Sequence, residues 1–290
     1  MSVGVVDVGS NTVRLLLARG TNPVLSLRET LGLGECVERF GRIPDAKLRE
    51  TAAVVASFVD AAWDAGASRL EVLITSPGRQ AANGAELLAA IESTAAAPVR
   101  VLSAEEEGRL AFAGALAVSG GPAGRRVGVV DVGGGSAQVA IGSRRDGASW
   151  IRSIDLGSRR LTSRLLSDDP PGPEATAKAR AEVERLLDGF RPPESRVVLA
   201  VGGSARALRR IVGGTLGSKE LAEATEILAR TPSDELVARY DLNPQRVGTL
   251  AGGAVILTVL QQHLGAPMKV VRGGLRDGAV LELAERRAAA

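Results

Sequence analysis

Apolar positions along the chain form short β-branched runs that alternate with longer amphipathic stretches. The first run, Val3 to Val8, leads through a small-residue turn to a second run, Val13 to Leu17. This order predicts a strand, a tight turn and a strand. Further strands are expected at 24–30, 69–75, 99–102, 127–132, 137–141, 149–155, 196–201 and 268–271, and helices at 45–65, 85–92, 104–118, 174–188, 244–263 and 275–287. Strands that alternate with helices in two halves indicate an α/β chain with mixed sheets.

Polar residues and glycines mark the ends of several expected elements. Asp45 is expected to cap the helix that starts there, and Gly66 to end it. The letters Leu31-Gly32-Leu33-Gly34 are expected to break the third strand. Asn243, followed by a proline, is expected to cap a long apolar helix to His263. The most apolar part of that helix is too short to span a bilayer, so it is interpreted as a buried core helix.

A seven-residue repeat is the strongest pattern in the sequence. The letters VGVVDVG occur at 3–9 and again at 127–133. Each copy ends a strand with an acid, Asp7 or Asp131, and continues into a turn of small residues. Glycines let the backbone take positive φ and turn N–H groups outward, which favours anion binding. An acid beside a bound phosphate repels it unless a hard cation lies between them, so the repeat also predicts Mg²⁺ or Mn²⁺. The alternative is a plain hairpin.

The spacing of the two copies suggests two domains. At 290 residues the chain is long enough for two domains of ordinary size. The small-residue stretch 119–124 is the clearest linker. We therefore expect a first domain over 1–119 and a second over 120–275, with a C-terminal helix of about 276–290 returning to the first.

Composition narrows the function classes. A single cysteine, Cys36, excludes an internal disulfide framework and a cysteine-rich metal site, which fits a reducing compartment. No basic or apolar leader precedes Val3, and we expect a cytoplasmic protein. The net charge of +3 comes mostly from arginines, whose forks suit phosphate oxygens, although a compositional bias that places them on solvated faces explains them as well. No basic stretch is interleaved with aromatics, so nucleic acid is not expected as a partner.

Two further classes of site are disfavoured. His263 is the single histidine and lies two residues before Gly265, where a helix C-terminus is the simpler interpretation. A histidine-based acid–base or zinc site is therefore not expected. The chain also lacks a GxxxxGK[ST] loop, which excludes a P-loop ATPase.

An acidic cluster follows the expected strand at 99–102. Ser103 and Glu106 have the spacing of a capping box, in which the glutamate folds back to the helix start. Glu105 and Glu107 are then left free in the first turn, where the helix dipole favours ionised carboxylates. Such a carboxylate suits a general base that takes a proton from water. The alternative is an ordinary acid-rich helix start.

These motifs together resemble the exopolyphosphatase and guanosine pentaphosphate phosphatase (Ppx/GppA) family, a branch of the actin, Hsp70 and sugar-kinase superfamily. The resemblance covers essentially the whole chain, in the segments DVGSNTVRLLL from Asp7, TSPGRQAAN from Thr75, SAEEEGRLAFAGAL from Ser103, DVGGGSAQVAIG from Asp131, LGSRRLTSRLL from Leu156, VGGSARALRRIVG from Val201 and GGLRDGAVLEL from Gly273. It implies two ribonuclease-H-like domains with a cleft between them.

The resemblance also implies roles for single residues. Glu107 matches the catalytic glutamate that activates water, and Arg79 matches an arginine near the phosphate chain. Asp7 and Asp131 match the acids near the metal. The two phosphate-binding turns correspond to Gly9, Ser10, Asn11 and Thr12, and to Gly133, Gly134, Gly135 and Ser136. Gly203 and Ser204 match a third glycine turn, for which a simple strand-to-helix turn is the alternative.

Three positions depart from the family pattern. Gln138 stands where the family usually has a glutamate, and the loss of that carboxylate is expected to weaken metal binding or turnover. Pro77-Gly78 replaces a small aliphatic pair before Arg79, and Asp277 replaces a glutamate.

The leading hypothesis is a cytoplasmic exopolyphosphatase that removes terminal phosphate from inorganic polyphosphate. The first alternative is hydrolysis of the 5′-phosphate of pppGpp, which would connect the protein to the stringent response. The second is a weakly active binding regulator, because of Gln138. A kinase of the same superfamily is disfavoured by the glutamate helix. Because dimers are common in the family, the resemblance also implies a homodimer, to which residues 244–263 could contribute either as an interface or not at all if that helix is buried. Neither a membrane nor nucleic acid is an expected partner.

Overall fold

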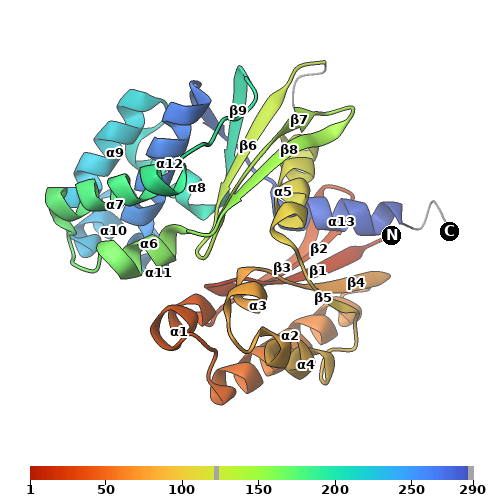
Figure 1. Ribbon diagram of the computed structural model, residues 1–290. Helices are drawn as coiled ribbons and strands as arrows, with labels where there is room; N and C mark the ends of the chain where they lie inside the picture. The colour runs from red at the N-terminus through yellow and green to blue at the C-terminus, as the bar shows by residue number, and fades with distance from the viewer. Residues whose placement is uncertain (121–123, 287–290) are drawn as a thin grey trace. The chain divides into compact units, whose positions relative to one another are not determined.

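The computed structural model describes residues 1–120 and 124–286, and the chain divides into two compact units (Figure 1). Unit 1 comprises Met1–Val118 and the chain from Gly273, and unit 2 comprises Ser119–Arg272. Residues 121–123 of the expected linker and 287–290 of the expected last helix lie outside the described residues.

Unit 1 is built on a mixed five-stranded sheet in the order β3-β2-β1-β4-β5. Its strands are β1 (Val3–Val8), β2 (Thr12–Arg19), β3 (Asn22–Thr30), β4 (Arg69–Ile74) and β5 (Val99–Val101). The repeat places β1 at the centre, where it pairs antiparallel with β2 and parallel with β4. The ranges expected from the sequence agree with these strands to within two residues at each end, because runs of β-branched residues bounded by turns indicate strands.

Helices cover both faces of this sheet (Figure 1). They are α1 (Leu33–Phe40), α2 (Asp45–Asp64), α3 (Ser76–Gln80), α4 (Gly84–Glu92), α5 (Ala104–Ser119) and α13 (Leu275–Glu285). Side chains alternate along β1, so Val6 and Val8 pack in one core with α2 and α4. Val3 and Val5 pack in a second core with α5 and α13. Asp7 has the same alternation as Val3 and Val5, which directs it to the α13 side.

Two details of unit 1 differ from expectation. Asp45 does not cap α2, because the cap position is Pro44 and Asp45 is the first helical residue, where it pairs with Arg42. The second difference is α1. The glycines in the stretch 31–34 indicated only a break after the third strand, so no helix was expected there. Gly34 lies so close to Ser10 that an added Cβ would crowd that residue. Glycine is therefore required here for close packing rather than for breaking the chain.

Unit 2 repeats the same sheet, in the order β10-β9-β6-β7-β8. Its strands are β6 (Val127–Val132), β7 (Ala137–Ser143), β8 (Gly147–Ile154), β9 (Val197–Val201) and β10 (Met268–Val270). The register is the same as in unit 1: Asp7 pairs with Arg14, and Asp131 pairs with Gln138, each 124 positions on. The sequence repeat is thus a structural repeat.

The helices of unit 2 gather on one face of its sheet (Figure 1). They are α6 (Ser158–Leu165), α7 (Gly172–Leu186), α8 (Gly202–Val212), α9 (Ser218–Arg230), α10 (Ser233–Tyr240), α11 (Pro244–Val247) and α12 (Leu250–Leu264). The single helix expected from 244 to 263 is wrong, since the chain breaks after Val247 at Gly248 and Thr249. Asn243 does cap the first piece, accepting a hydrogen bond from the backbone N–H of Gln245 at 2.9 Å.

The helix α12 lies in the core of unit 2. Its side chains from Ala254 to Leu260 are buried, and most join the core cluster of this unit. This confirms the buried core helix, and it leaves little of α12 as a surface for a second copy. Two mixed five-stranded sheets flanked by helices confirm the expected α/β fold class.

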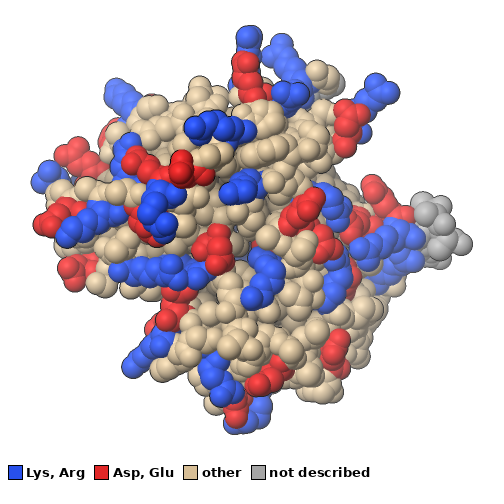
Figure 2. Space-filling view, in the orientation of Figure 1, with Lys and Arg blue, Asp and Glu red and all other residues tan. Residues whose placement is uncertain are grey.

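Charged side chains of both signs occur together on one face of the molecule. On the face shown in Figure 2, basic and acidic residues are interspersed. Several arginines pair with an acid one helical turn away, as Arg180 does with Glu184 and Arg185 with Glu182. Among the described residues, none of the helices combines the length and apolarity needed to cross a bilayer.

Candidate active site

The first small-residue turn joins β1 to β2, and backbone hydrogen bonds within the turn, from α1 and from residues 31–32 hold it in place. The N–H of Gly9 donates to the carbonyl of Thr12 at 3.1 Å, which closes the turn. The N–H of Gly34 in α1 donates to the carbonyl of Ser10 at 2.6 Å, and those of Leu31 and Gly32 to Asn11 at 3.0 and 3.2 Å. Because the Gly9 N–H is used internally, an anion here would have to be met by later groups of the turn.

Ser76 and Thr75, which could not be recognised as site residues from the sequence, support the same turn. The hydroxyls of Ser76 and Ser10 lie 2.6 Å apart, and both side chains are buried. Thr75 donates its hydroxyl hydrogen to the carbonyl of Val8 at 3.2 Å. Both residues belong to the TSPGR segment, whose serine and threonine are typical of a helix start but carry no sign of this long-range contact.

Asp7 lies beside this turn in a poorly solvated position. Its side chain is 19% exposed, and its carboxylate is 3.9 Å from the guanidinium of Arg276 on α13. Burial raises the pKa of Asp7, and the charges of Arg276 and Arg14 offset part of that rise. A largely buried carboxylate whose charge is incompletely compensated is a favourable ligand for a hard cation.

The cost of burying this charge leads to a stability prediction. Asp7→Asn should raise the melting temperature by a few degrees at pH 7 with chelator present, because it removes the buried charge and keeps the shape. Thermal unfolding followed by circular dichroism measures this, with Asp60→Asn on the exposed side of α2 as the control. A lower melting temperature for Asp7→Asn would show that the two arginines outweigh the burial cost.

Glu107 lies in the first turn of α5, as expected, but it is not free. Its side chain is buried, with the residue 4% exposed. Its Oε2 accepts a hydrogen bond from Nη2 of Arg79 at 2.9 Å, and Nη1 of Arg79 donates to the carbonyl of Leu102 at 2.6 Å. The expectation of a free Glu107 is therefore wrong, because α3 brings Arg79 to the start of α5.

The capping box at the start of α5 is confirmed. The N–H of Glu106 donates to the hydroxyl of Ser103 at 3.1 Å, and the N–H of Ser103 donates to Oε2 of Glu106 at 2.8 Å. That hydrogen bond is the largest cause of a lowered pKa at Glu106, and Arg100 adds to it against the opposing effect of burial. Glu106 is therefore held as a carboxylate.

This lowered pKa predicts how the helix start responds to acid. A carboxyl group with a folded pKa below its unfolded value of about 4.5 stabilises the fold above that value, and the contribution disappears as pH falls through the folded pKa. Wild-type protein should thus lose stability below about pH 4.5 more steeply than Glu106→Gln. Urea midpoints between pH 3 and 7 test this, and parallel curves for the two proteins would contradict it.

The second turn, between β6 and β7, is closed by the same backbone hydrogen bond as the first. The N–H of Gly133 donates to the carbonyl of Ser136 at 2.9 Å, and the N–H groups of Arg159 and Arg160 reach the carbonyl of Gly134 at 3.0 and 3.2 Å. Gln138 of β7 pairs with Asp131 in the strand register. Its side chain is buried, and its Nε2 donates to the Ser136 hydroxyl at 2.9 Å. The amide thus orients a hydroxyl of the turn, which a carboxylate could not do by donation.

The third glycine turn begins α8 directly after β9. Gly202 has φ of 88°, and a Cβ there would crowd the carboxylate of Asp131. A Cβ on Gly203 would collide with the guanidinium of Arg246, which covers this position. Ser204 is buried beside Gly253 of α12. The glycines here allow close approach of charged side chains, whereas the burial of Ser204 fits a packing role.

A metal bound through Asp7 or Asp131 would have few protein ligands. Within residues 1–120 and 124–286, no three His, Cys, Asp or Glu side chains gather into a metal-binding group. Mg²⁺ commonly takes one or two carboxylates, with water and substrate phosphates completing its octahedron. Asp7, a poorly solvated carboxylate at the end of β1, fits that kind of ligand set, and Asp131 occupies the equivalent position in unit 2.

Comparison with known proteins settles the family. The model of the Ppx/GppA phosphatase family matches residues 15–287. The chain belongs to the Ppx/GppA family. It is 27% identical to Exopolyphosphatase 1 of Mycobacterium tuberculosis over 303 residues, covering 97% of this chain and 88% of the relative. Identity to Exopolyphosphatase 2 of the same organism is 28% over 318 residues, covering 97% and 98%.

Solved structures agree with this membership. An exopolyphosphatase-like protein superimposes with a TM-score of 0.88 at 25% identity, covering 99% of this chain and all of the other. The Ppx/GppA family member of Aquifex aeolicus gives a TM-score of 0.84 at 24% identity, covering 99% and 98%, which shows the shared fold. The family and the named relatives indicate that the chain is a phosphoanhydride hydrolase.

Proposed function

We propose that this member of the Ppx/GppA family is an exopolyphosphatase, with Glu107 as the base that activates water. The proposal rests on the buried carboxylate of Glu107 at the start of α5, whose Oε2 lies 2.9 Å from Nη2 of Arg79. A general base needs a fixed direction toward the proton it takes. The relatives named as exopolyphosphatases support polyphosphate as the substrate.

The proposed reaction is an in-line displacement. Glu107 takes a proton from a water molecule while the water oxygen attacks the terminal phosphorus. The bond between that phosphorus and the bridging oxygen breaks, and the bridging oxygen leaves with the shortened chain. Asp7 in unit 1 and Asp131 in unit 2 would each offer a carboxylate to Mg²⁺, which would neutralise charge on the phosphate oxygens when bound. The turns at 9–12 and 133–136 would orient phosphate groups through N–H and hydroxyl donors.

A direct comparison of substrates tests the proposal. Orthophosphate release should be measured with purified protein and Mg²⁺ on polyphosphate and on pppGpp, at matched concentrations of chain ends. We expect kcat/KM to be at least about tenfold higher for polyphosphate. A reversed ratio would assign the protein to pppGpp hydrolysis with the same residues, because both substrates end in a phosphoanhydride. The cytoplasmic location and the homodimer remain predictions.

A second candidate function, a weakly active binding regulator, is favoured by Gln138. In this protein the amide donates to Ser136 and stands directly across from Asp131 in the strand register. Gln138→Glu would lose that donor and place two carboxylates side by side. We therefore expect Gln138→Glu to lower the melting temperature without metal and to change kcat on polyphosphate by less than about tenfold. A large rise in kcat from a near-zero wild-type rate would instead support the regulator.

A further inference from the structure

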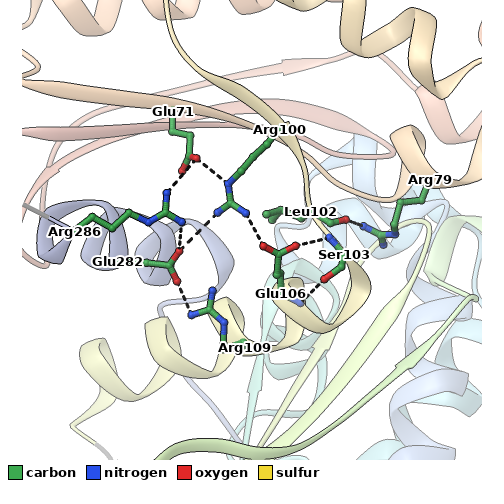
Figure 3. A network of polar contacts seen from close by, with 9 residues as sticks. All are labelled: Glu71, Arg79, Arg100, Leu102, Ser103, Glu106, Arg109, Glu282 and Arg286. Atoms are coloured by element: carbon green, nitrogen blue, oxygen red, sulfur yellow. Dashed lines mark hydrogen bonds and ion pairs between the residues drawn. The ribbon is translucent and has the colours of Figure 1, made fainter. Parts of the chain in front are cut away.

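A network of three arginines and three glutamates lies next to the helix start that carries Glu107 (Figure 3). At its centre, Arg100 of β5 donates from Nε to Glu71 of β4 at 2.8 Å and from Nη1 to Glu106 of α5 at 2.7 Å. Its Nη2 is 3.7 Å from Glu282 of α13. One guanidinium thus joins two strands and two helices of unit 1.

The outer members of the network complete its charge balance. Arg109 of α5 pairs with Glu282 at 2.5 Å, and Arg286 lies 2.6 Å from Glu282 and 3.6 Å from Glu71. Three guanidinium groups therefore meet three carboxylates. Burial lowers the pKa of Arg100, but its bonds to Glu71 and Glu106 outweigh that effect and raise the pKa overall, so Arg100 stays charged.

The two oxygens of Glu106 connect this network to the helix start. Oε1 accepts from Arg100, and Oε2 accepts from the N–H of Ser103 in the capping box. The next residue is Glu107, whose N–H donates to the carbonyl of Ser103 at 3.1 Å. Glu106 therefore links Arg100 to the backbone of the turn that carries the proposed base.

A second arginine holds the same segment from another side. Figure 3 shows Arg100 and Arg79 approaching residues 102–106 from opposite directions. Arg79 fixes the carbonyl of Leu102 and the carboxylate of Glu107, and Arg100 fixes the carboxylate of Glu106. The first turn of α5 is thus held between two guanidinium groups.

We propose that Arg100 is a positioning residue for Glu107: through Glu106 and the capping box it fixes the backbone of the first turn of α5, and so the direction of the carboxylate that activates water. This inference rests on the proposed function of Glu107. A displacement of about 1 Å at a reacting group can lower a rate about a hundredfold. A network that limits such movement therefore affects kcat more than substrate binding.

The geometry requires arginine in particular. Three of its nitrogens point to three different carboxylates, a fork that a single lysine ammonium cannot reproduce. Arg100→Lys should accordingly restore the charge but only part of the rate. This separates a positioning effect from a general effect of charge in unit 1.

The decisive experiment places Arg100→Met in two backgrounds, wild type and Glu107→Gln. With a Glu107 base present, we expect Arg100→Met to lower kcat on polyphosphate about tenfold with KM changed less than about twofold. In the Glu107→Gln background it should leave the residual rate unchanged, because the group that it positions is gone. Partial unfolding would instead lower both rates by the same factor.

Two further variants keep the test interpretable. Arg286→Met removes pairs to Glu71 and Glu282 but makes no contact with α5 in the network, so its kcat should stay within about twofold of wild type. Arg100→Met leaves the buried Glu71 with an incomplete ion pair, and this can destabilise the fold. Glu106→Gln acts from the more exposed partner: its single amide oxygen can accept from Arg100 or from the N–H of Ser103 but not from both, so one of the two contacts is lost and kcat should fall by a similar factor.

The outcomes separate this inference from the proposed function. A wild-type rate for Glu107→Gln alone would refute the assignment of the base, whatever Arg100 does. A slow Glu107→Gln combined with equal losses from Arg100→Met in both backgrounds would refute the positioning role and leave the base intact. Normal kcat in both Arg100→Met and Glu106→Gln would also refute it.

Discussion

Replacing Glu107 by glutamine is expected to lower kcat for phosphate release from polyphosphate by about 10²- to 10⁴-fold, the usual contribution of a general base. Glutamine has the same shape and can still accept the hydrogen bond from Arg79, but it cannot take a proton from water. Because the side chain is buried at the first turn of α5, substrate binding should change little. KM should therefore stay within about threefold.

The measurement is steady-state orthophosphate release, with thermal unfolding as a check on folding. Glu105→Gln is the matched control, since it is the neighbouring carboxylate in the same helical turn. It should retain the wild-type rate to within about twofold. Equal rates for Glu107→Gln and wild type would remove Glu107 as the base and leave the fold and the family unaffected.

Most of the fold could be predicted because the repeat and the strand pattern act locally. VGVVDVG gave both central strands, and the matched register of Asp7 with Arg14 and of Asp131 with Gln138 extends the repeat beyond the seven letters. Two of the errors fall at glycines. Gly34 lies inside α1, where it packs against the first turn, whereas Gly248 lies between α11 and α12 although its own backbone angles stay helical. Sequence pattern alone does not distinguish these two cases.

The candidate site was less predictable than the fold because its contacts join distant segments. The capping box of Ser103 and Glu106 spans three residues and could be found by spacing. The partner of Glu107 is Arg79, 28 positions away on α3, and nothing in the local pattern points to it. The Ser10–Ser76 contact bridges 66 positions. Such pairs depend on the packing of whole elements.

The largest expected loss of stability comes from adding one methyl group where α5 and α13 cross. A Cβ on Gly278 would collide with the carbonyl of Leu110 and approach the backbone N of Gly114. Both obstacles are backbone atoms, so no side chain can rotate away and α13 itself must move. Such overpacking typically costs about 1–3 kcal/mol. For Gly278→Ala we therefore expect a melting temperature several degrees lower.

Gly248→Ala is the matched control, because a Cβ there meets nothing within 4 Å and the backbone is already helical. Its melting temperature should be unchanged or slightly higher, since alanine restricts the unfolded chain. In contrast, Gly278→Ala should also lower kcat, because α13 carries Glu282 of the arginine network and Arg276 beside Asp7. A stable and fully active Gly278→Ala would mean that α5 and α13 can separate without disturbing either contact, and that the position of α13 does not matter to the proposed base.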